Sequence, residues 1–135
     1  MLKYEDLSID MISKRIPRFR NAIEPTRAYW ATHAYELTPY DFLYSGFVLD
    51  ILELYKRGEF AGIQEYFDFA EWMLQNSEDE KIEDLVQVGF LEYFWESPEL
   101  YNLARKCAGE KTKVLFGRVS AYLGGPYIEK AGKQP

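Results

Sequence analysis

The sequence predicts an all-α protein: a single-domain helical bundle, or a short stack of antiparallel helical hairpins, with about five to six helices. Apolar residues recur at helical spacing along most of the 135 residues, and Ser, Thr, Pro and Gly stand where helices begin and end. β-propensity is modest throughout. The connections between the predicted helices are short, which favours antiparallel neighbours.

The N-terminal third predicts one helix, over residues 4–15, which Pro17 should end. We expect an irregular connection over residues 18–25. Residues 26–36 fit either a helical turn or an aromatic-rich loop. A small hairpin within residues 20–35 is the main alternative to an all-helical chain.

Start and stop signals are clearest in the middle of the chain. Thr38 suits an N-cap with Pro39 at the first helical position, and Gly58 suits the C-terminal cap of the same helix. The next predicted helix runs from Glu59 to Asn76, with an apolar stripe on one face.

Three more helices follow. The segment Ser77–Glu80 has the pattern of a capping box and should open a helix that runs to Trp95. Ser97 should cap a helix that ends near Cys107, and a last helix is predicted over residues 111–123. With no internal repeat or long linker, residues 1–135 should form one domain, with residues 127–135 as a frayed tail.

The composition, 47% hydrophobic and 28% charged, is that of a globular protein. The N-terminus lacks the cationic start of a signal peptide, and no apolar run approaches the length of a membrane span. The single cysteine, Cys107, cannot form an intrachain disulfide, and its apolar neighbours favour a core residue over a nucleophile. We therefore expect a cytoplasmic protein with no membrane partner.

Acidic residues are concentrated in the middle of the chain. Residues 59–100 contain twelve acids and one base, Lys81, whereas residues 1–58 balance eight acids with eight bases. Residues 101–135 contain two acids and seven bases, and the net charge is −6. Like charges one helical turn apart weaken a helix slightly, so stability does not explain this pattern.

We interpret the central segment as a surface for a basic partner. The predicted partner-binding residues are Glu65, Asp68, Glu71, Glu78, Asp79, Glu80, Glu83 and Asp84, with Trp72 as an aromatic anchor. An ordinary solvated helix face, compensated by the basic C-terminal segment, is the alternative. Direct binding of nucleic acid is not expected, because an acidic surface repels phosphate.

Candidate chemical sites are few. One His and one Cys make zinc improbable, no nucleotide or hydrolase motif is present, and we expect no metal, no cofactor and no enzymatic activity. Glu92 lies in an apolar run, where it could be a general acid, a hydrogen-bond acceptor for a tyrosine, or the partner of Arg27. The aromatic residues near His33 could pack in the core, line a pocket or anchor an interface. They are Tyr29, Trp30, Tyr35, Tyr40 and Tyr44.

The segment Ile82–Glu92, with the sequence IEDLVQVGFLE, resembles a stretch in small helical immunity proteins of bacterial polymorphic toxin and contact-dependent growth-inhibition systems. That resemblance implies a cytosolic, non-enzymatic inhibitor that neutralises one cognate toxin, often a basic nuclease, through protein–protein contact. It carries over no individual residue, because immunity interfaces vary between pairs. A small enzyme or ligand-binding domain using His33 and Glu92, or a helical adaptor, remains the alternative, and the oligomeric state is left open.

Overall fold

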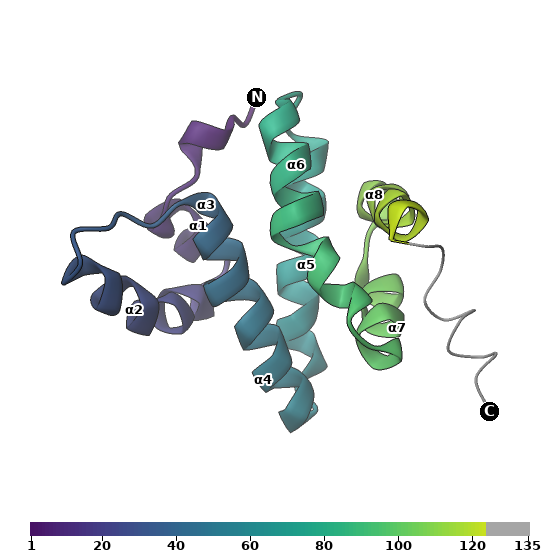
Figure 1. Ribbon diagram of the computed structural model, residues 1–135, viewed down its shortest axis with the longest axis horizontal. Coiled ribbons are helices and arrows are strands. Elements are labelled where there is room, and N and C mark those ends of the chain that lie inside the picture. Colours follow the sequence, from purple (N-terminus) through teal and green to yellow (C-terminus); the bar gives the residue numbers. More distant parts are fainter. Residues whose placement is uncertain (124–135) are drawn as a thin grey trace.

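The computed structural model describes residues 1–123, which form a single all-α domain and contain no strand (Figure 1). The predicted fold class is therefore confirmed, and no hairpin forms within residues 20–35. The elements in chain order are η1 (Tyr4–Asp6), α1 (Ile9–Arg15), α2 (Arg18–Ala31), α3 (Pro39–Asp41), η2 (Phe42–Val48), α4 (Leu49–Arg57), α5 (Phe60–Gln75), α6 (Glu80–Gly89), η3 (Leu91–Trp95), α7 (Pro98–Cys107) and α8 (Glu110–Tyr122). The tail predicted to fray, residues 127–135, lies outside the described residues.

Helix α5 lies at the centre of the domain. The N-terminal helices flank the α5–α6 pair on one side, and α7 and α8 flank it on the other (Figure 1). Ile63, Phe67, Ala70 and Met73 of α5 are fully buried, because α4, α6, α7 and α8 all pack against this helix. The apolar periodicity that predicted α5 thus marks the most enclosed helix of the fold.

The segment from residue 18 to 31 is a regular helix, α2, and the predicted irregular connection is wrong. Phe19 and Ile23 lie one turn apart and are fully buried, so core packing holds the helix together. Pro25 lies inside α2 on its exposed side. Its missing N–H leaves the carbonyl of Asn21 accessible to water, which reduces the cost of proline at this position.

Two other boundaries differ from the prediction. The predicted helix over residues 4–15 is split, because Ser8 caps a new helix by accepting the N–H of Met11 at 3.1 Å. The helix predicted to reach Trp95 begins after Asp79 as N-cap, and it ends at Gly89, after which the chain continues as the 3-10 helix η3. The Ser77 hydroxyl instead donates to the carbonyl of Leu2, which holds the N-terminus against the α5–α6 connection.

The other caps match the prediction. Pro39 opens α3 after Thr38, whose N–H donates to the Asp41 carboxylate at 2.8 Å. Gly58 ends α4 in the left-handed conformation with a φ of 72°, and Ser97 accepts the N–H of Leu100 at 3.1 Å at the start of α7. Each of these signals is local, which is why the sequence alone reveals it.

A π-helix, η2, joins α3 to α4. It contains Gly46, and a Cβ at this position would collide with the ring of Phe19 from α2. The absent side chain therefore lets α2 approach η2 closely, where Phe19 meets Phe47 edge-on at 5.5 Å between ring centroids.

Candidate partner-binding surface

Several of the acids that the sequence predicted to bind a partner accept hydrogen bonds from within the domain. The carboxylate of Glu71 accepts hydrogen bonds from the N–H of Lys111 at 3.2 Å, the N–H of Thr112 at 2.9 Å and the Thr112 hydroxyl at 2.8 Å. It therefore caps the first turn of α8. A Cβ at Gly109 would lie 2.6 Å from the Glu71 Cγ, so glycine there makes room for the cap.

These bonds also set the acidity of Glu71. Burial alone raises the pKa of the carboxyl, but the hydrogen bonds from Thr112, Lys111 and Gln75 outweigh burial and lower the pKa below its ordinary value. The ionised form is the one that caps α8, and it has little capacity left for a partner.

Asp79 and Trp72 are also engaged within the domain. Asp79 accepts the N–H of Lys81 and the N–H of Tyr4, each at 3.0 Å, and thereby fixes both the start of α6 and the N-terminal segment. The half-buried Trp72 ring lies 3.6 Å beneath the guanidinium of Arg15 from α1. Both side chains are half-buried, whereas the sequence predicted that they would be exposed to a partner.

The remaining predicted acids point in different directions. Glu83 pairs with Arg118 of α8 at 2.8 Å, and Asp84 accepts a short hydrogen bond from the Tyr40 hydroxyl. Asp68 accepts from Gln64 at 2.8 Å, beside the end of α7. The basic C-terminal segment thus compensates part of the acidic charge, as the alternative interpretation held. Glu78, Asp79, Glu80 and Glu83 line one pocket at the start of α6, whereas Glu71 contacts α8 and Asp84 contacts Tyr40.

Three predicted acids are exposed and unengaged: among residues 1–123, no hydrogen bond or ion pair is described for Glu65, Glu78 or Glu80. They lie on α5, in the α5–α6 connection and on α6. Glu78 and Glu80 line a small pocket with Glu83, whereas Glu65 lies on α5.

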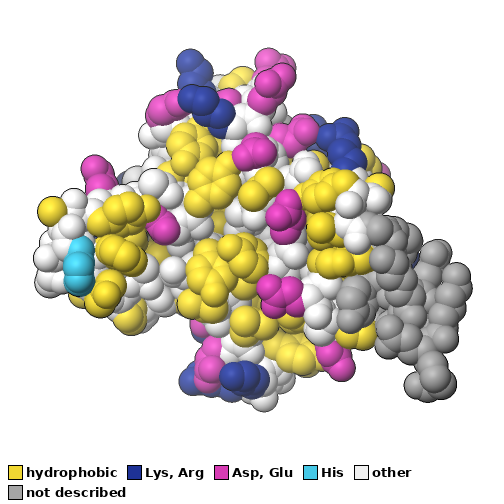
Figure 2. Space-filling model, in the orientation of Figure 1, with side chains coloured by type: hydrophobic (Ala, Val, Ile, Leu, Met, Phe, Trp, Pro, Cys, Tyr) yellow, Lys and Arg dark blue, Asp and Glu magenta, His cyan; other side chains and the backbone are white. Residues whose placement is uncertain are grey.

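A different surface combines exposed and half-buried tyrosines with carboxylates. We name it the tyrosine face; its residues are Tyr4, Tyr40, Tyr44, Tyr93, Tyr122, Asp84, Glu92 and Glu96. Figure 2 shows hydrophobic side chains with carboxylates between them on the side that carries α4 and α6, with Lys and Arg towards the margins. None of the eight residues is basic.

Direct contacts join the members of this surface. The rings of Tyr4 and Tyr40 lie 6.2 Å apart, and Tyr40 covers Gly89, where a Cβ would lie 3.0 Å from the tyrosine ring. One helical turn further on, the ring centroid of Tyr44 lies 4.8 Å from that of Tyr93 in η3. Three segments distant in sequence therefore meet at one continuous surface.

Two hydroxyls of this surface donate hydrogen bonds to its carboxylates. Tyr122 donates a short hydrogen bond to Glu92, and Tyr40 does the same to Asp84. Burial, together with the Asp84 carboxylate, raises the pKa of Tyr40 well above its usual value. Burial and the nearby Tyr44, Glu96 and Glu92 likewise raise the pKa of Tyr93. The hydroxyls of Tyr40 and Tyr93 therefore stay protonated at neutral pH and add no charge to that of the carboxylates.

The sequence predicted only part of the tyrosine face as a candidate site. It grouped Tyr40 and Tyr44 with the aromatic residues near His33, but the structure separates the two sets. Tyr29, Trp30, His33 and Tyr35 pack on one another at the C-terminal end of α2, where all four are exposed. The four-residue spacing of Tyr40 and Tyr44 was a signal that they share a helix face.

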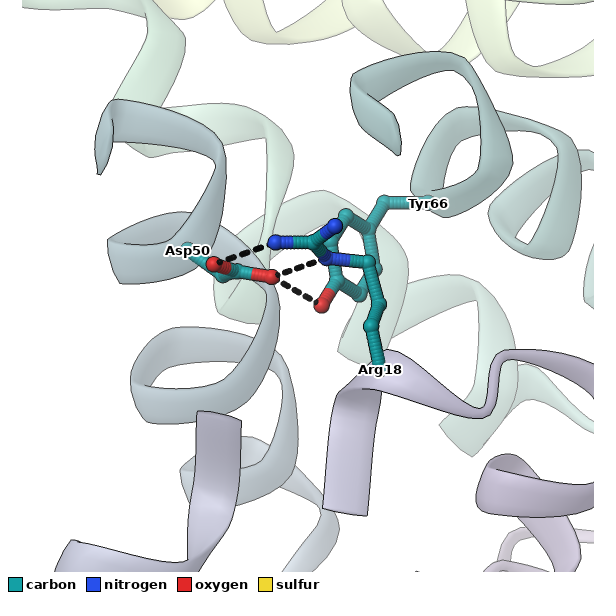
Figure 3. Close-up of polar contacts among 3 residues, drawn as sticks. All are labelled: Arg18, Asp50 and Tyr66. Carbon is teal, nitrogen blue, oxygen red and sulfur yellow. Dashed lines mark hydrogen bonds and ion pairs between the residues drawn. The ribbon is translucent and has the colours of Figure 1, made fainter. Parts of the chain in front are cut away.

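A second polar site, missed in the sequence, ties three helices together (Figure 3). The Arg18 guanidinium of α2 makes two bonds to Asp50 of α4, Nε to Oδ2 at 2.7 Å and Nη2 to Oδ1 at 3.2 Å. The hydroxyl of Tyr66 from α5, fully buried, donates to the same Oδ2 at 2.6 Å. The carboxylate therefore satisfies both donors, which indicates a structural role.

A model of the protein family described as "Domain of unknown function (DUF7674)" matches residues 9–123. The chain belongs to this family. Comparisons with curated proteins and with solved structures found no match. The family's match begins at α1 and ends just after α8, so it contains all of the tyrosine face except Tyr4.

In this member of the DUF7674 family, the structure does not bring His33 and Glu92 together. His33 contacts Tyr29 and Trp30 at the end of α2, at the margin of the molecule in Figure 2, whereas Glu92 accepts from Tyr122 of α8. Arg27, which the sequence offered as a partner for Glu92, pairs with Glu24 at 2.6 Å instead.

Two other features bear on chemistry. Cys107 is buried, and burial raises the pKa of its thiol, which keeps the sulfur protonated at neutral pH. Within residues 1–123, no group of three or more His, Cys, Asp or Glu side chains is arranged to hold a metal ion. None of the helices in this part of the chain is long and apolar enough to cross a membrane.

Proposed function

We propose that the protein is a binding protein that recognises a basic partner protein through the tyrosine face. The contiguity of Tyr40, Tyr44 and Tyr93 with Asp84 and Glu92 carries this proposal. Tyrosine provides a large contact area with few rotatable bonds, and it is enriched at the energetically important centres of interfaces.

The charges of this surface define the class of partner. Its three acids stand beside tyrosine rings, and Lys81, at the border, is paired with Glu5 at 3.3 Å. A guanidinium or ammonium group could therefore bind a carboxylate and lie against a tyrosine ring at the same time. The net charge of −6 would accelerate encounter with such a partner.

The partner that we propose is a cognate toxin domain in the cytoplasm, with a basic nuclease as the expected activity. Support for this step comes from the resemblance of Ile82–Glu92 to immunity proteins and from the acidity of the chain. An inhibitor of this kind covers the phosphate-binding surface of the nuclease with its own carboxylates. A helical adaptor would use the same surface without suppressing any activity.

The test is binding between this protein and the purified product of the neighbouring upstream gene, combined with a nuclease protection assay. Tyr44→Ala and Tyr93→Ala should each weaken binding by about tenfold or more, since central tyrosines cost about 2 kcal/mol or more when truncated. Glu96→Lys should weaken binding most at low salt. Tight binding with no protection would favour the adaptor.

Two matched variants control this experiment. Tyr55→Ala removes a comparably exposed tyrosine on α4, and Glu65→Lys reverses a carboxylate on α5; both lie outside the tyrosine face. Each should leave the affinity within about twofold, as is usual for residues outside an interface. Equal losses in the controls and in the tyrosine-face variants would refute the proposed surface.

A further inference from the structure

A pocket of about 530 Å³ lies between α7 and α8. Arg105 and Lys106 from the last turn of α7 line it, and Lys113 of α8 lines it as well. Its other lining residues are Asn102, Gly117 and the aromatic pair Tyr101 and Phe116, which are both buried and lie 5.0 Å apart between ring centroids. Three cations thus surround an aromatic floor.

Among residues 1–123, these cations have no counter-charge within the pocket: no acidic residue lines it, and Arg105, Lys106 and Lys113 form no ion pair. Arg118, the residue after Gly117, is paired with Glu83. Three like charges around one cavity repel one another, and a bound anion would relieve that repulsion.

Gly117 provides an independent observation. Glycine inside a helix is destabilising relative to alanine, so packing usually requires it where it occurs. At Gly46, Gly89 and Gly109 an added Cβ would meet neighbouring atoms, but at Gly117 it would meet no atom of residues 1–123 within 4 Å. Packing therefore does not require this glycine. Gly117 lines the pocket, so its missing side chain leaves space there.

We propose that this pocket binds a small phosphate-bearing ligand with an apolar or aromatic group, which goes beyond the proposed function of the tyrosine face. Arg105, Lys106 and Lys113 bind the phosphate, and the edges of Tyr101 and Phe116 contact the apolar group. The volume lies in the range of small-molecule sites.

The direct test is an NMR titration of the full chain with inorganic phosphate and with phenyl phosphate, at constant ionic strength. Both should produce saturable shifts confined to the amides near Tyr101, Arg105 and Gly117, and phenyl phosphate should bind several-fold more tightly because it also meets the aromatic floor. Vesicles of phosphatidylcholine, with and without a phosphoinositide, identify the source of the phosphate. If the phosphoinositide vesicles bind more tightly than phenyl phosphate, the source is a lipid headgroup. If they do not, the source is a free ligand. Shifts that are linear, or spread over the surface, would overturn the proposal.

Variants sharpen the test. Arg105→Gln and Lys113→Gln should each reduce phosphate affinity by about tenfold, since a charge-assisted hydrogen bond is lost. Gly117→Leu should abolish binding by filling the pocket while raising the melting temperature, because leucine favours a helix. Lys56→Gln, an exposed cation on α4, is the control and should change nothing. Unchanged affinity in Gly117→Leu would show that the phosphate binds elsewhere.

Discussion

Asp50 is the residue on which the contacts among α2, α4 and α5 converge. Its carboxylate accepts from both the Arg18 guanidinium and the Tyr66 hydroxyl, and Tyr66 is fully buried. Burial, reinforced by the bond to Asp50, raises the pKa of Tyr66 far above its usual value. The hydroxyl therefore remains a donor at neutral pH.

Asp50→Ala should lower the free energy of unfolding by about 2–4 kcal/mol, because it leaves a guanidinium and a buried hydroxyl without their acceptor. Urea denaturation followed by circular dichroism measures the change. Asp10→Ala is the matched control, since it breaks an exposed ion pair with Arg20 and should have a much smaller effect. Similar losses in the two variants would contradict the structural role of Asp50.

Glu71 makes the stability depend on pH. Its pKa in the folded protein lies below the ordinary value of 4.5, so its contribution is present above about pH 4.5 and is lost as the pH falls through the folded pKa. We expect Glu71→Gln to destabilise the protein by about 0.5–2 kcal/mol at pH 7, in the range of a helix cap. That difference should shrink as the pH approaches 3.

Denaturation curves for wild type and Glu71→Gln between pH 7 and 3 test this expectation. Glu65→Gln serves as the control, because no partner is described for the exposed Glu65 within residues 1–123. Its difference from wild type should stay small at every pH. A constant deficit of Glu71→Gln across the series would mean that the cap does not depend on ionisation.

At the scale of elements, the π-helix η2 contains Gly46 and the helix α8 contains Gly117. Alanine should have opposite effects on stability at these two positions. Gly46→Ala should cost about 1–3 kcal/mol, because the new methyl group collides with Phe19. Gly117→Ala meets open space and should stabilise the protein by about 0.5–1 kcal/mol. Melting temperatures of the two variants should therefore move in opposite directions.

A double variant isolates the cause of the first effect. Phe19→Leu shortens the facing side chain, so adding it to Gly46→Ala should cost less than the sum of the two single changes. Strict additivity would mean that Gly46 is required for the backbone of η2 and not for the approach of α2.

Element boundaries were predictable where a local signal marks them. Thr38 with Pro39, Gly58 and Ser97 all stand where the structure starts or ends a helix. The helix α2 was not predictable in this way, because Pro17 and Pro25 argue locally for an irregular segment. Burial of its inner face against η2 overrides that local preference.

At the scale of the whole molecule, the tyrosine face and the α7–α8 pocket should act independently. Tyr44 lies on η2 and Arg105 on α7, and the α5–α6 pair lies between these parts of the fold (Figure 1). The two sites share α8, which carries both Tyr122 and Lys113, but Tyr44 and Arg105 lie on separate elements, and substitutions at residues with no shared partner usually combine additively. We expect Tyr44→Ala to leave phosphate affinity within about twofold, and Arg105→Gln to do the same for partner affinity.

Measuring both affinities for the two variants tests this independence. A change of more than about tenfold in the opposite site, which corresponds to about 1.4 kcal/mol, would reveal coupling between the partner and the phosphate-bearing ligand. The experiment also separates the two proposals, since either binding activity can fail while the other persists.

The sequence by itself determined the all-α class, the central helix α5 and most caps, because helical periodicity and capping act between residues a few positions apart. Only the tertiary structure decided which charges are free to meet a partner. Glu71 and Thr112 are 41 positions apart, Glu83 and Arg118 are 35 apart, and Tyr40 and Asp84 are 44 apart. Such pairs arise when helices pack, and no local pattern in the sequence records them.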